Sequence, residues 1–507
     1  MNDNSRTANV KRNILWSTMS QIVLALFSMV SRTIFIYVLG AKYLGVSGLF
    51  SNILGILSFT NLGIGSAINY ALYKPIAEND TEKIKALMKL YKVAYRIIAV
   101  VIAVLGCAVI PFLHYLVNTD IPMDQIRVFY ILFLIDTVAS YFVSYKTSYV
   151  TAIQKNYIIT NLNTIATVIT YVVQIAILFI VPSYLIYLIN QIIMSLILKV
   201  VTVVYLDKKF PILAEKNAQP LDVETKQSIW KNVKALVIHK FGDAAVNQTD
   251  NIIISMFVGT LSVGLVSNYT TLSSIVGNFT NTLLNSFTAS FGNLIAKESI
   301  EKQRKIFDLY DFAGFWIYGF VFIAFTTLVQ PFITLWLGED LLIDNMTMML
   351  LFLSIYLQGM TIITYNFKVA AGRFDEDKWV AFVQAGVNLI VSIAAVKAIG
   401  LPGVYVGTIA QRLIVVIVRP YIVYKYVLKD NAMKYFSRFL LRVGIIFSIV
   451  FVMWKIESVV LYEITLFRFV IMVVLTAIIP NFVILLIYGR TEMFKTLFNK
   501  YILRKVA

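Results

Sequence analysis

Residues 34–45 read IFIYVLGAKYLG, and residues 253–264, which lie 219 positions later, read IISMFVGTLSVG. Gly40 matches Gly259 at this offset, and Gly45 matches Gly264. The same offset also pairs Ile76-Ala77 with Ile295-Ala296, Glu82-Lys83 with Glu301-Lys302, and Leu90-Tyr91 with Leu309-Tyr310. Because the matches fall at equivalent points of successive apolar segments, they predict an internal duplication.

The composition is that of a membrane protein along the whole chain. Of the 507 residues, 59% are hydrophobic and 14% are charged, and the mean hydropathy is +0.79. An ordinary soluble domain has about 25% charged residues. The single cysteine, Cys107, excludes an internal disulfide, and the two histidines are far apart in sequence, so we expect no metal site and no cofactor.

Apolar runs of about 20 residues predict membrane-spanning helices. We expect an all-α polytopic protein with about fourteen of them. Their expected ranges are 14–39, 45–73, 93–117, 126–150, 157–180, 183–206, 235–258, 265–292, 307–335, 346–370, 379–400, 403–424, 436–457 and 464–488. The first run is too long for a signal-peptide core and is expected to remain attached.

The duplication divides these spans into two lobes. Each repeat contains six spans, an even number, so both repeats enter the membrane with the same polarity and form two lobes with a site between them. We expect an N-lobe at 1–206, a cytoplasmic linker at 207–233 and a C-lobe at 234–428. Residues 429–507 hold two further helices and a tail.

The net charge of +17 follows the expected topology. The connections on the side of the N-terminus, counted together with the adjoining span ends, hold 32 Lys and Arg residues, whereas the opposite connections with their span ends hold three. This bias predicts that both termini lie in the cytoplasm and that the protein is in the cell membrane. The basicity also attracts anionic lipids, so no nucleic-acid partner is needed to explain it.

Polar side chains share faces of several predicted spans. They are Gln21 and Arg32 in the first, Asn61 and Asn69 in the second, Asp136 in the fourth, His239, Lys240, Asp243 and Asp250 in the seventh, Asn278 and Asn285 in the eighth, Lys368 in the tenth, Gln384 and Asn388 in the eleventh, and Thr408 and Arg412 in the twelfth. Such residues can form interhelical hydrogen bonds or line a water-filled cavity. Their number favours the cavity.

The charged positions have two interpretations that depend on depth. His239, Lys240, Lys146 and Lys368 lie near cytoplasmic helix ends, where long side chains can reach the headgroups. Arg32 and Asp136 lie deeper, as do Asp250 and Arg412, where a charge costs about 2.5–3.5 kcal/mol on insertion scales. A functional role, or pairing that serves one, is the expectation for these four residues.

Two amphipathic segments are predicted to lie on the inner leaflet. Residues 83–92 place Ile84, Leu87, Met88 and Tyr91 opposite four lysines. The tail places Phe494, Leu497, Phe498 and Tyr501 opposite basic residues.

Two stretches resemble a known family. The run over residues 10–80, which begins VKRNILWSTMSQIVLALF, is similar to the opening of bacterial polysaccharide flippases for O-antigen, capsule or teichoic-type repeat units. Residues 238–269, IHKFGDAAVNQTDNIIISMFVGTLSVGLVSNY, resemble the seventh and eighth helices of that family. The family belongs to the multidrug/oligosaccharidyl-lipid/polysaccharide exporter superfamily, and the resemblance covers essentially the whole chain.

The resemblance implies two six-helix lobes around a cationic cavity, with two extra helices. It implies transport of undecaprenyl-diphosphate-linked oligosaccharide from the inner to the outer leaflet for cell-surface polysaccharide synthesis. The implied partners are this lipid-linked glycan, membrane lipids, and the polymerase with other assembly proteins. In the related lipid II flippases, arginines of the first helices and the eighth helix hold the diphosphate; here only Arg32 sits in a comparable place.

With that function, the candidate residues fall into two sets. Substrate binding in the cavity is assigned to Arg32, Gln21, Asn61, Asn69, Lys240, Asn278, Asn285, Lys368 and Arg412. Ion coupling or charge pairing is assigned to Asp136, His239, Asp243 and Asp250. The repeat places Arg32 level with Asn251, so an ion pair between Arg32 and Asp250 is expected when the cavity is empty.

Two other functions remain open. An ion-coupled exporter of cationic drugs would need an acidic and aromatic site. A membrane glycosyltransferase or polymerase would need a sizeable outer loop with catalytic acids, whereas the outer connections here are short. The chain lacks a GxxxxGK[ST] loop, so energy must come from an ion gradient, the membrane potential or consumption of the product. We expect a transporter, not an enzyme.

Overall fold

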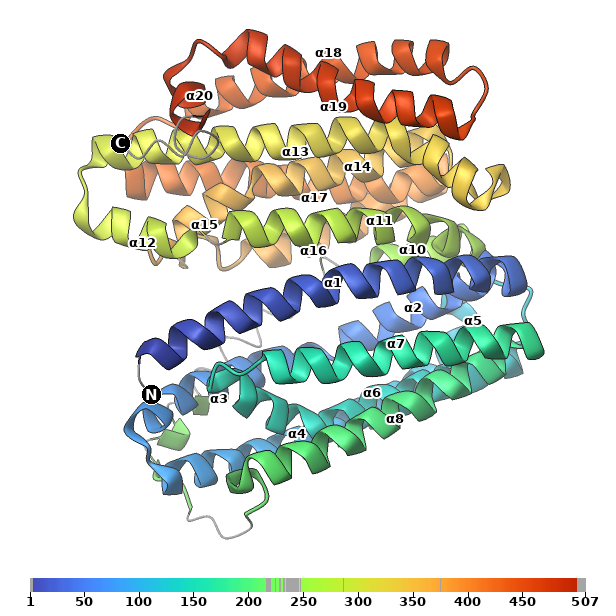
Figure 1. The fold of residues 1–507 in the computed structure, drawn as a ribbon, viewed down its shortest axis with the longest axis vertical. Coiled ribbons are helices and arrows are strands. Elements are labelled where there is room, and N and C mark those ends of the chain that lie inside the picture. The colour runs from blue at the N-terminus through green and yellow to red at the C-terminus, as the bar shows by residue number, and fades with distance from the viewer. Residues whose placement is uncertain are drawn as a thin grey trace. The chain divides into compact units, whose positions relative to one another are not determined.

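The computed structural model describes residues 3–215, 220–223, 225–227, 229–230, 233, 246, 248–285, 287–373 and 375–498. Within these ranges it describes only the backbone of residues 3–11, 14, 59–64, 66, 67 and 289. Regular structure over these ranges is helical throughout. Contacts divide the chain into two compact units, Met1–Gly264 and Leu265–Ala507. Figure 1 shows the helices of each unit.

Eleven helices among the described residues are long and apolar enough to cross a membrane. They match eleven of the expected spans, so the all-helical, multi-pass class is confirmed. The expected span at 45–73 is broken at Ser58 into two helices, and half of 235–258 lies outside the described residues. The expected span at 265–292 falls on a more polar helix, Thr260–Asn285, which is not among the eleven. The count of fourteen and the arrangement of the lobes therefore remain predictions.

The first unit is built from a series of long helices. Those described are α1 (Asp3–Leu39), α2 (Ala41–Leu57), α3 (Phe59–Glu78), α4 (Thr81–Val109), α5 (Leu113–Leu116), α6 (Met123–Ala152), α7 (Tyr157–Ile180), α8 (Tyr184–Lys209), α10 (Asp250–Phe257) and the start of α11 (Thr260–Asn285). Helix α6 packs against both α4 and α8, and α1 lies along α7 (Figure 1). Helix α10 packs on α2, although the repeat assigns it to the C-lobe.

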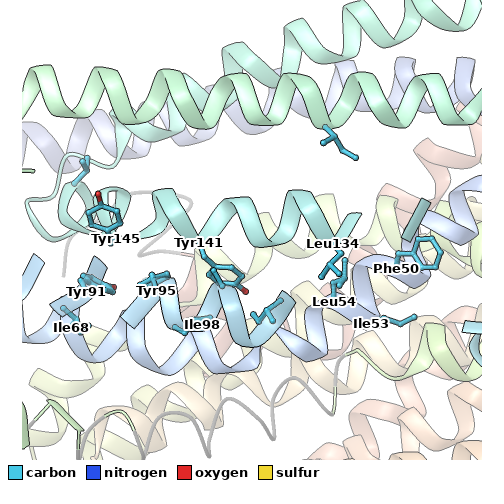
Figure 2. Packing of buried hydrophobic residues seen from close by; sticks show 14 of the residues in the cluster. Phe50, Ile53, Leu54, Ile68, Tyr91, Tyr95, Ile98, Leu134, Tyr141 and Tyr145 are labelled. Carbon is cyan, nitrogen blue, oxygen red and sulfur yellow. The ribbon is translucent and has the colours of Figure 1, made fainter. Parts of the chain in front are cut away.

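The core of the first unit contains many aromatic side chains. Figure 2 shows Tyr91 and Tyr95 of α4 on the side of the helix that faces Tyr141 of α6. The rings of Tyr95 and Tyr141 are 6.2 Å apart between centroids. The Tyr91 hydroxyl donates to the backbone oxygen of Gly65 at 2.8 Å. These contacts hold the α3–α4–α6 part of the unit together.

The predicted surface helix at 83–92 is wrong. Helix α4 begins at Thr81, where the Asp80 side chain accepts from the backbone N–H of Lys83 at 2.9 Å, and continues to Val109. Leu87 and Tyr91 on its apolar face are fully buried. This face packs against protein because α3 and α6 lie beside it, and an amphipathic pattern alone does not distinguish a lipid surface from a protein partner.

The second unit continues with α12 (Thr288–Lys297), α13 (Ile300–Leu337), α14 (Asn345–Met360), α15 (Ile362–Ala370), α16 (Val380–Ile399), α17 (Leu401–Ile422), the π-helix η5 (Val423–Leu428), α18 (Met433–Val460), α19 (Leu466–Tyr488) and α20 (Glu492–Leu497). Helices α16 and α17 form a close pair. Helices α18 and α19 pack on α13 (Figure 1).

The second predicted surface helix also packs partly on protein. Phe494 of α20 is 6% exposed, and its ring lies 5.4 Å from that of Trp316 on α13. Phe498 is more exposed and stacks on Phe494 at 6.0 Å. The tail therefore covers α13 with the face that was expected to contact lipid, and residues 499–507 lie outside the described residues.

Candidate functional site

An ion pair joins two membrane-spanning helices of the first unit. The Lys199 ammonium on α8 donates to Asp136 Oδ1 on α6 at 2.5 Å, and also contacts Ser195 Oγ at 2.8 Å. The Lys199 side chain is 16% exposed and that of Asp136 is 36% exposed. Both residues lie well inside their spans, where an unpaired charge would be costly. Asp136 is a predicted charge-pairing residue, whereas no sequence pattern indicated Lys199 as its partner.

A polar pocket and an apolar groove meet at this pair. The pocket, of about 350 Å³, lies among α2, α6 and α8, and its polar lining includes Ser51, Asp136 and Gln191. The groove, of about 890 Å³, lies among α4, α6 and α8. Lys199 is the one charged side chain in its described lining. The arrangement offers hydrogen bonds on one side and hydrocarbon contact on the other, which suits an amphipathic molecule.

We expect Lys199→Met to destabilise the protein, because it leaves the partly buried Asp136 carboxylate without its cation. The double variant Lys199→Met with Asp136→Leu should recover most of the lost thermal stability, since neither charge then remains. Thermal unfolding in detergent checks this expectation. Equal stability of the single and double variants would show that the pair contributes nothing to the fold.

Amide side chains connect α2 to the segment that begins α10. Asn52 donates to Gln248 Oε1 at 2.7 Å, and Asn251 donates to Asn52 Oδ1 at 2.9 Å. Farther along, the Thr260 backbone N–H and hydroxyl both donate to the backbone oxygen of Asn118, at 2.9 and 2.8 Å. The polar residues of these elements therefore satisfy one another in this structure.

The predicted substrate residues of the first unit are only partly described. Gln21 is exposed on α1, and Arg32 is half-buried near Tyr171 and Tyr187. Asn69 on α3 is half-buried. Asp250 begins α10. His239, Lys240 and Asp243, together with the Asn61 side chain, lie outside the described residues, so the Arg32–Asp250 pair and the coupling role of these residues remain predictions.

The predicted residues of the second unit lie on three helices. Asn278 and Asn285 are exposed on α11, and Asn366 of α15 donates to Asn285 Oδ1 at 3.0 Å. Lys368 on α15 is buried and contacts Asp377 Oδ1 at 2.5 Å. Arg412 is half-buried on α17. Lys368 therefore has a carboxylate partner that the sequence pattern does not reveal.

The polar stripes of α16 and α17 face each other. Gln384 donates to Gln411 Oε1 at 2.5 Å, and Asn388 donates to the Thr408 hydroxyl at 3.3 Å. Gln384, Asn388 and Gln411 are buried. For this pair of helices the interhelical hydrogen-bond interpretation therefore holds in place of the cavity interpretation.

Two further ion pairs, outside the predicted site residues, each contain at least one buried charge. Lys146 on α6 pairs with Asp207 on α8, and Arg442 on α18 pairs with Asp311 on α13 at 2.5 Å. A sequence signal existed for each, since a charge inside an apolar run needs a partner. The sequence does not say which helix provides that partner.

The comparisons with known proteins agree with this architecture. A family model described as polysaccharide biosynthesis protein matches residues 10–291. Among curated proteins, none matches the chain. Because 282 residues exceed half of the chain, the match to the family model confirms the family resemblance found in the sequence.

Several solved structures share the fold. The lipid II flippase MurJ in an inward closed conformation has 13% identity and a TM-score of 0.64, with 95% of this chain and 99% of that chain covered. An inward-facing multidrug resistance MATE family transporter of the MOP superfamily has 13% identity and a TM-score of 0.61. The match covers 79% of this chain and 96% of that chain. A mutant of the Vibrio cholerae MATE transporter VcmN has 14% identity and a TM-score of 0.56. The match covers 85% of this chain and 99% of that chain. At these identities the similarity shows the fold alone.

Proposed function

The chain belongs to the polysaccharide biosynthesis protein family, and we propose on that basis that it moves undecaprenyl-diphosphate-linked oligosaccharide repeat units from the inner to the outer leaflet of the cell membrane. The family match over residues 10–291 carries the proposal. The fold shared with a lipid II flippase supports it. In this proposal the lipid-linked glycan and the surrounding lipids are the partners, the polymerase and other assembly proteins act next, and the protein performs no chemical step.

Physical chemistry supports a transporter for such a substrate. A sugar hydroxyl that enters hydrocarbon without a hydrogen-bond partner costs several kcal/mol, so an oligosaccharide crosses a bilayer unaided at a negligible rate. Gln21, Asn278 and Asn285 are exposed, and in this proposal their amides replace the water that the sugar hydroxyls lose. We propose that the cationic residues Arg32, Lys240, Lys368 and Arg412 hold the diphosphate, while Asn61 and Asn69 contact the sugar.

The same proposal assigns the acidic residues to energy coupling. Asp136, with Lys199 as its partner, is the described member of this set, and His239, Asp243 and Asp250 complete it. We place both termini in the cytoplasm because of the charge bias. Drug export remains the alternative because MATE transporters share the fold. The two functions differ in cargo, so the sidedness of the lipid-linked glycan in cells distinguishes them.

We expect Arg32→Ala to be inserted and stable, yet to lower flipping about tenfold or more. A hydrogen bond to a charged group contributes about 1.5–3 kcal/mol, and arginine binds phosphate through two parallel bonds. Lipid-linked repeat units should accumulate on the inner side, measured as the fraction that an impermeant oxidant fails to reach in cells without polymerase. Arg32→Lys should keep partial function, and Asp250→Asn should be milder.

Arg468→Ala is the matched control. Arg468 lies in the first turn of α19 and pairs with Glu463 at 3.2 Å. The variant removes one membrane-region arginine without touching α1, so flipping should be unchanged. Normal outer-face glycan from a well-expressed Arg32→Ala protein would contradict the assignment of Arg32.

A further inference from the structure

A second polar cavity lies in the second unit, at the ends of three membrane-spanning elements. It has a volume of about 580 Å³ and lies among the start of α13, the π-helix η5 and the start of α18. Its lining includes Arg304, Asp308, Tyr424, Lys434, Ser437 and Arg438. The charge bias predicts that these helix ends lie on the cytoplasmic side, at the level of lipid headgroups.

The cavity has an excess of positive charge. Three cations, Arg304, Lys434 and Arg438, line it together with two acids, Asp308 and Asp430. The pKa of Asp430, which lies between α17 and α18, is lowered chiefly by the backbone N–H of Asn431, and the three cations act in the same direction. Asp430 is half-buried, and the lowering of its pKa shows that its surroundings are positively charged.

The fold itself orients Arg304. This residue donates through Nε and Nη2 to the backbone oxygen of Leu428, at 3.0 and 2.8 Å. Nη2 of Arg304 also reaches the backbone oxygen of Lys429 at 2.8 Å. Lys429 has φ = 51°, a left-handed conformation that costs free energy for a residue with a side chain. Arg304 thus stabilises a strained turn directly after a π-helix, and π-helices occur frequently at functional sites.

Other donors in the cavity are not used up by the fold. Arg438 donates through Nη2 to Asp308 and to the Tyr424 hydroxyl, each at 2.7 Å, but its buried Nε has no hydrogen-bond partner among the described residues. Lys434 and Ser437 line the cavity from the first two turns of the 28-residue helix α18. At the N-terminus of this helix the Asn431 side chain accepts from the backbone N–H of Met433 at 2.8 Å, and such a helix end favours negative charge.

The flank of the cavity is suited to lipid contact. Met433 is 64% exposed beside it, and Leu440 and Leu441 of the next turns are similarly exposed. A molecule that fills the cavity can therefore place a charged group among the cations and a hydrocarbon chain against α18. This combination distinguishes a lipid from a free anion.

We propose that this cavity binds the phosphate-bearing headgroup of an inner-leaflet lipid, with the hydrocarbon chain along α18. Phosphate oxygens would accept from the Lys434 ammonium and the Ser437 hydroxyl, beside the guanidinium groups of Arg304 and Arg438. The lipid is either a bulk anionic phospholipid or the lipid-linked diphosphate before transport; the second case rests on the proposed function. Either lipid would fasten α18, which lies outside the predicted repeat, to α13.

The test uses the full-length protein in nanodiscs of zwitterionic lipid, with phosphatidylglycerol or undecaprenyl diphosphate added. Native mass spectrometry counts the retained lipid. We expect the double variant Lys434→Ala with Ser437→Ala to retain about fivefold less anionic lipid than the wild type, since one lysine near an anionic headgroup contributes about that factor. Its thermal stability in zwitterionic lipid should be unchanged, because the Arg438–Asp308 pair is intact.

Lys425→Ala is the matched control. Lys425 is an exposed cation of η5 that contacts Tyr421 and does not line the cavity. This variant loses the same charge and should retain lipid normally. Equal lipid loss from both variants, or none from the double variant, would overturn the proposal. Preference for undecaprenyl diphosphate would identify a substrate site, and equal retention of phosphatidylglycerol would identify a structural lipid. A failure here leaves the Arg32 experiment unaffected.

Discussion

Asp311→Ala is expected to destabilise the protein by about 3–5 kcal/mol, the usual effect of removing one partner of a buried ion pair. Asp311 on α13 is 1% exposed and Arg442 on α18 is 4% exposed, with 2.5 Å between Nη1 and Oδ2. Arg442 also lies over the Phe315 ring, 5.1 Å from its centroid. Without Asp311, the guanidinium stays in an apolar environment and loses its carboxylate partner. Thermal unfolding in detergent measures the effect.

A double variant separates the charge from the packing. Asp311→Leu with Arg442→Met removes both charges and fills much of the same volume, so it should recover most of the lost stability. Asp308→Ala is the matched single variant one turn away. Its partner Arg438 is 30% exposed and also contacts Tyr424, so the loss should be smaller. Wild-type stability of Asp311→Ala would show that this pair does not hold α18 on α13.

Gly45→Ala is expected to abolish the close crossing between α2 and the start of α11. A Cβ at Gly45 would lie 1.8 Å from the backbone oxygen of Thr260, and one at Gly264 would lie 2.0 Å from that of Ala41. Backbone atoms cannot yield as a flexible side chain can, so the two elements must move apart. A transport cycle that brings α2 and α11 together at this crossing cannot do so once they are held apart, so we expect the flipping rate to fall about tenfold or more. A tenfold fall corresponds to a rise of about 1.4 kcal/mol in the activation barrier.

A disulfide reports the crossing directly. A Cβ at Gly48 would lie 3.5 Å from Val263 Cγ1, so cysteines at Gly48 and Val263 should crosslink when Cys107 is replaced by serine. Adding Gly45→Ala should abolish the crosslink. Gly444→Ala is the control, because a Cβ at Gly444 on α18 meets nothing within 4 Å. An unchanged crosslink in the Gly45→Ala protein would show that the crossing tolerates the methyl group.

The paired glycines show which structural features a sequence pattern alone can predict. The offset of 219 pairs Gly40 with Gly259 and Gly45 with Gly264 on residue type alone. In the structure Gly40 and Gly259 both have positive φ, at +84° and +129°, directly before a helix. Gly45 and Gly264 are in close contact. A backbone requirement for glycine leaves a mark in the residue type itself, so one chain is enough to detect it.

The length of the hydrophobic runs was likewise enough to predict a helical membrane protein with many spans. It depends on a local property, since a span needs about 20 apolar residues wherever its neighbours lie. Eleven expected spans are helices in the structure for this reason. The family resemblance is confirmed by the match over residues 10–291. The site residues, the lobe boundaries and the orientation remain predictions.

The pairing of charges depended on tertiary packing. Helical periodicity shows which residues share a face of one helix, but the partner comes from another element whose rotation and depth no local pattern specifies. The sequence indicates that Asp136 and Lys368 are candidate site residues, but it does not identify their partners Lys199 and Asp377. Each pair is in contact at 2.5 Å in the structure. The sequence also shows the apolar face of α4, but the prediction that lipid covers this face is wrong. An amphipathic pattern indicates only that a face is covered, and tertiary packing determines whether lipid or protein covers it.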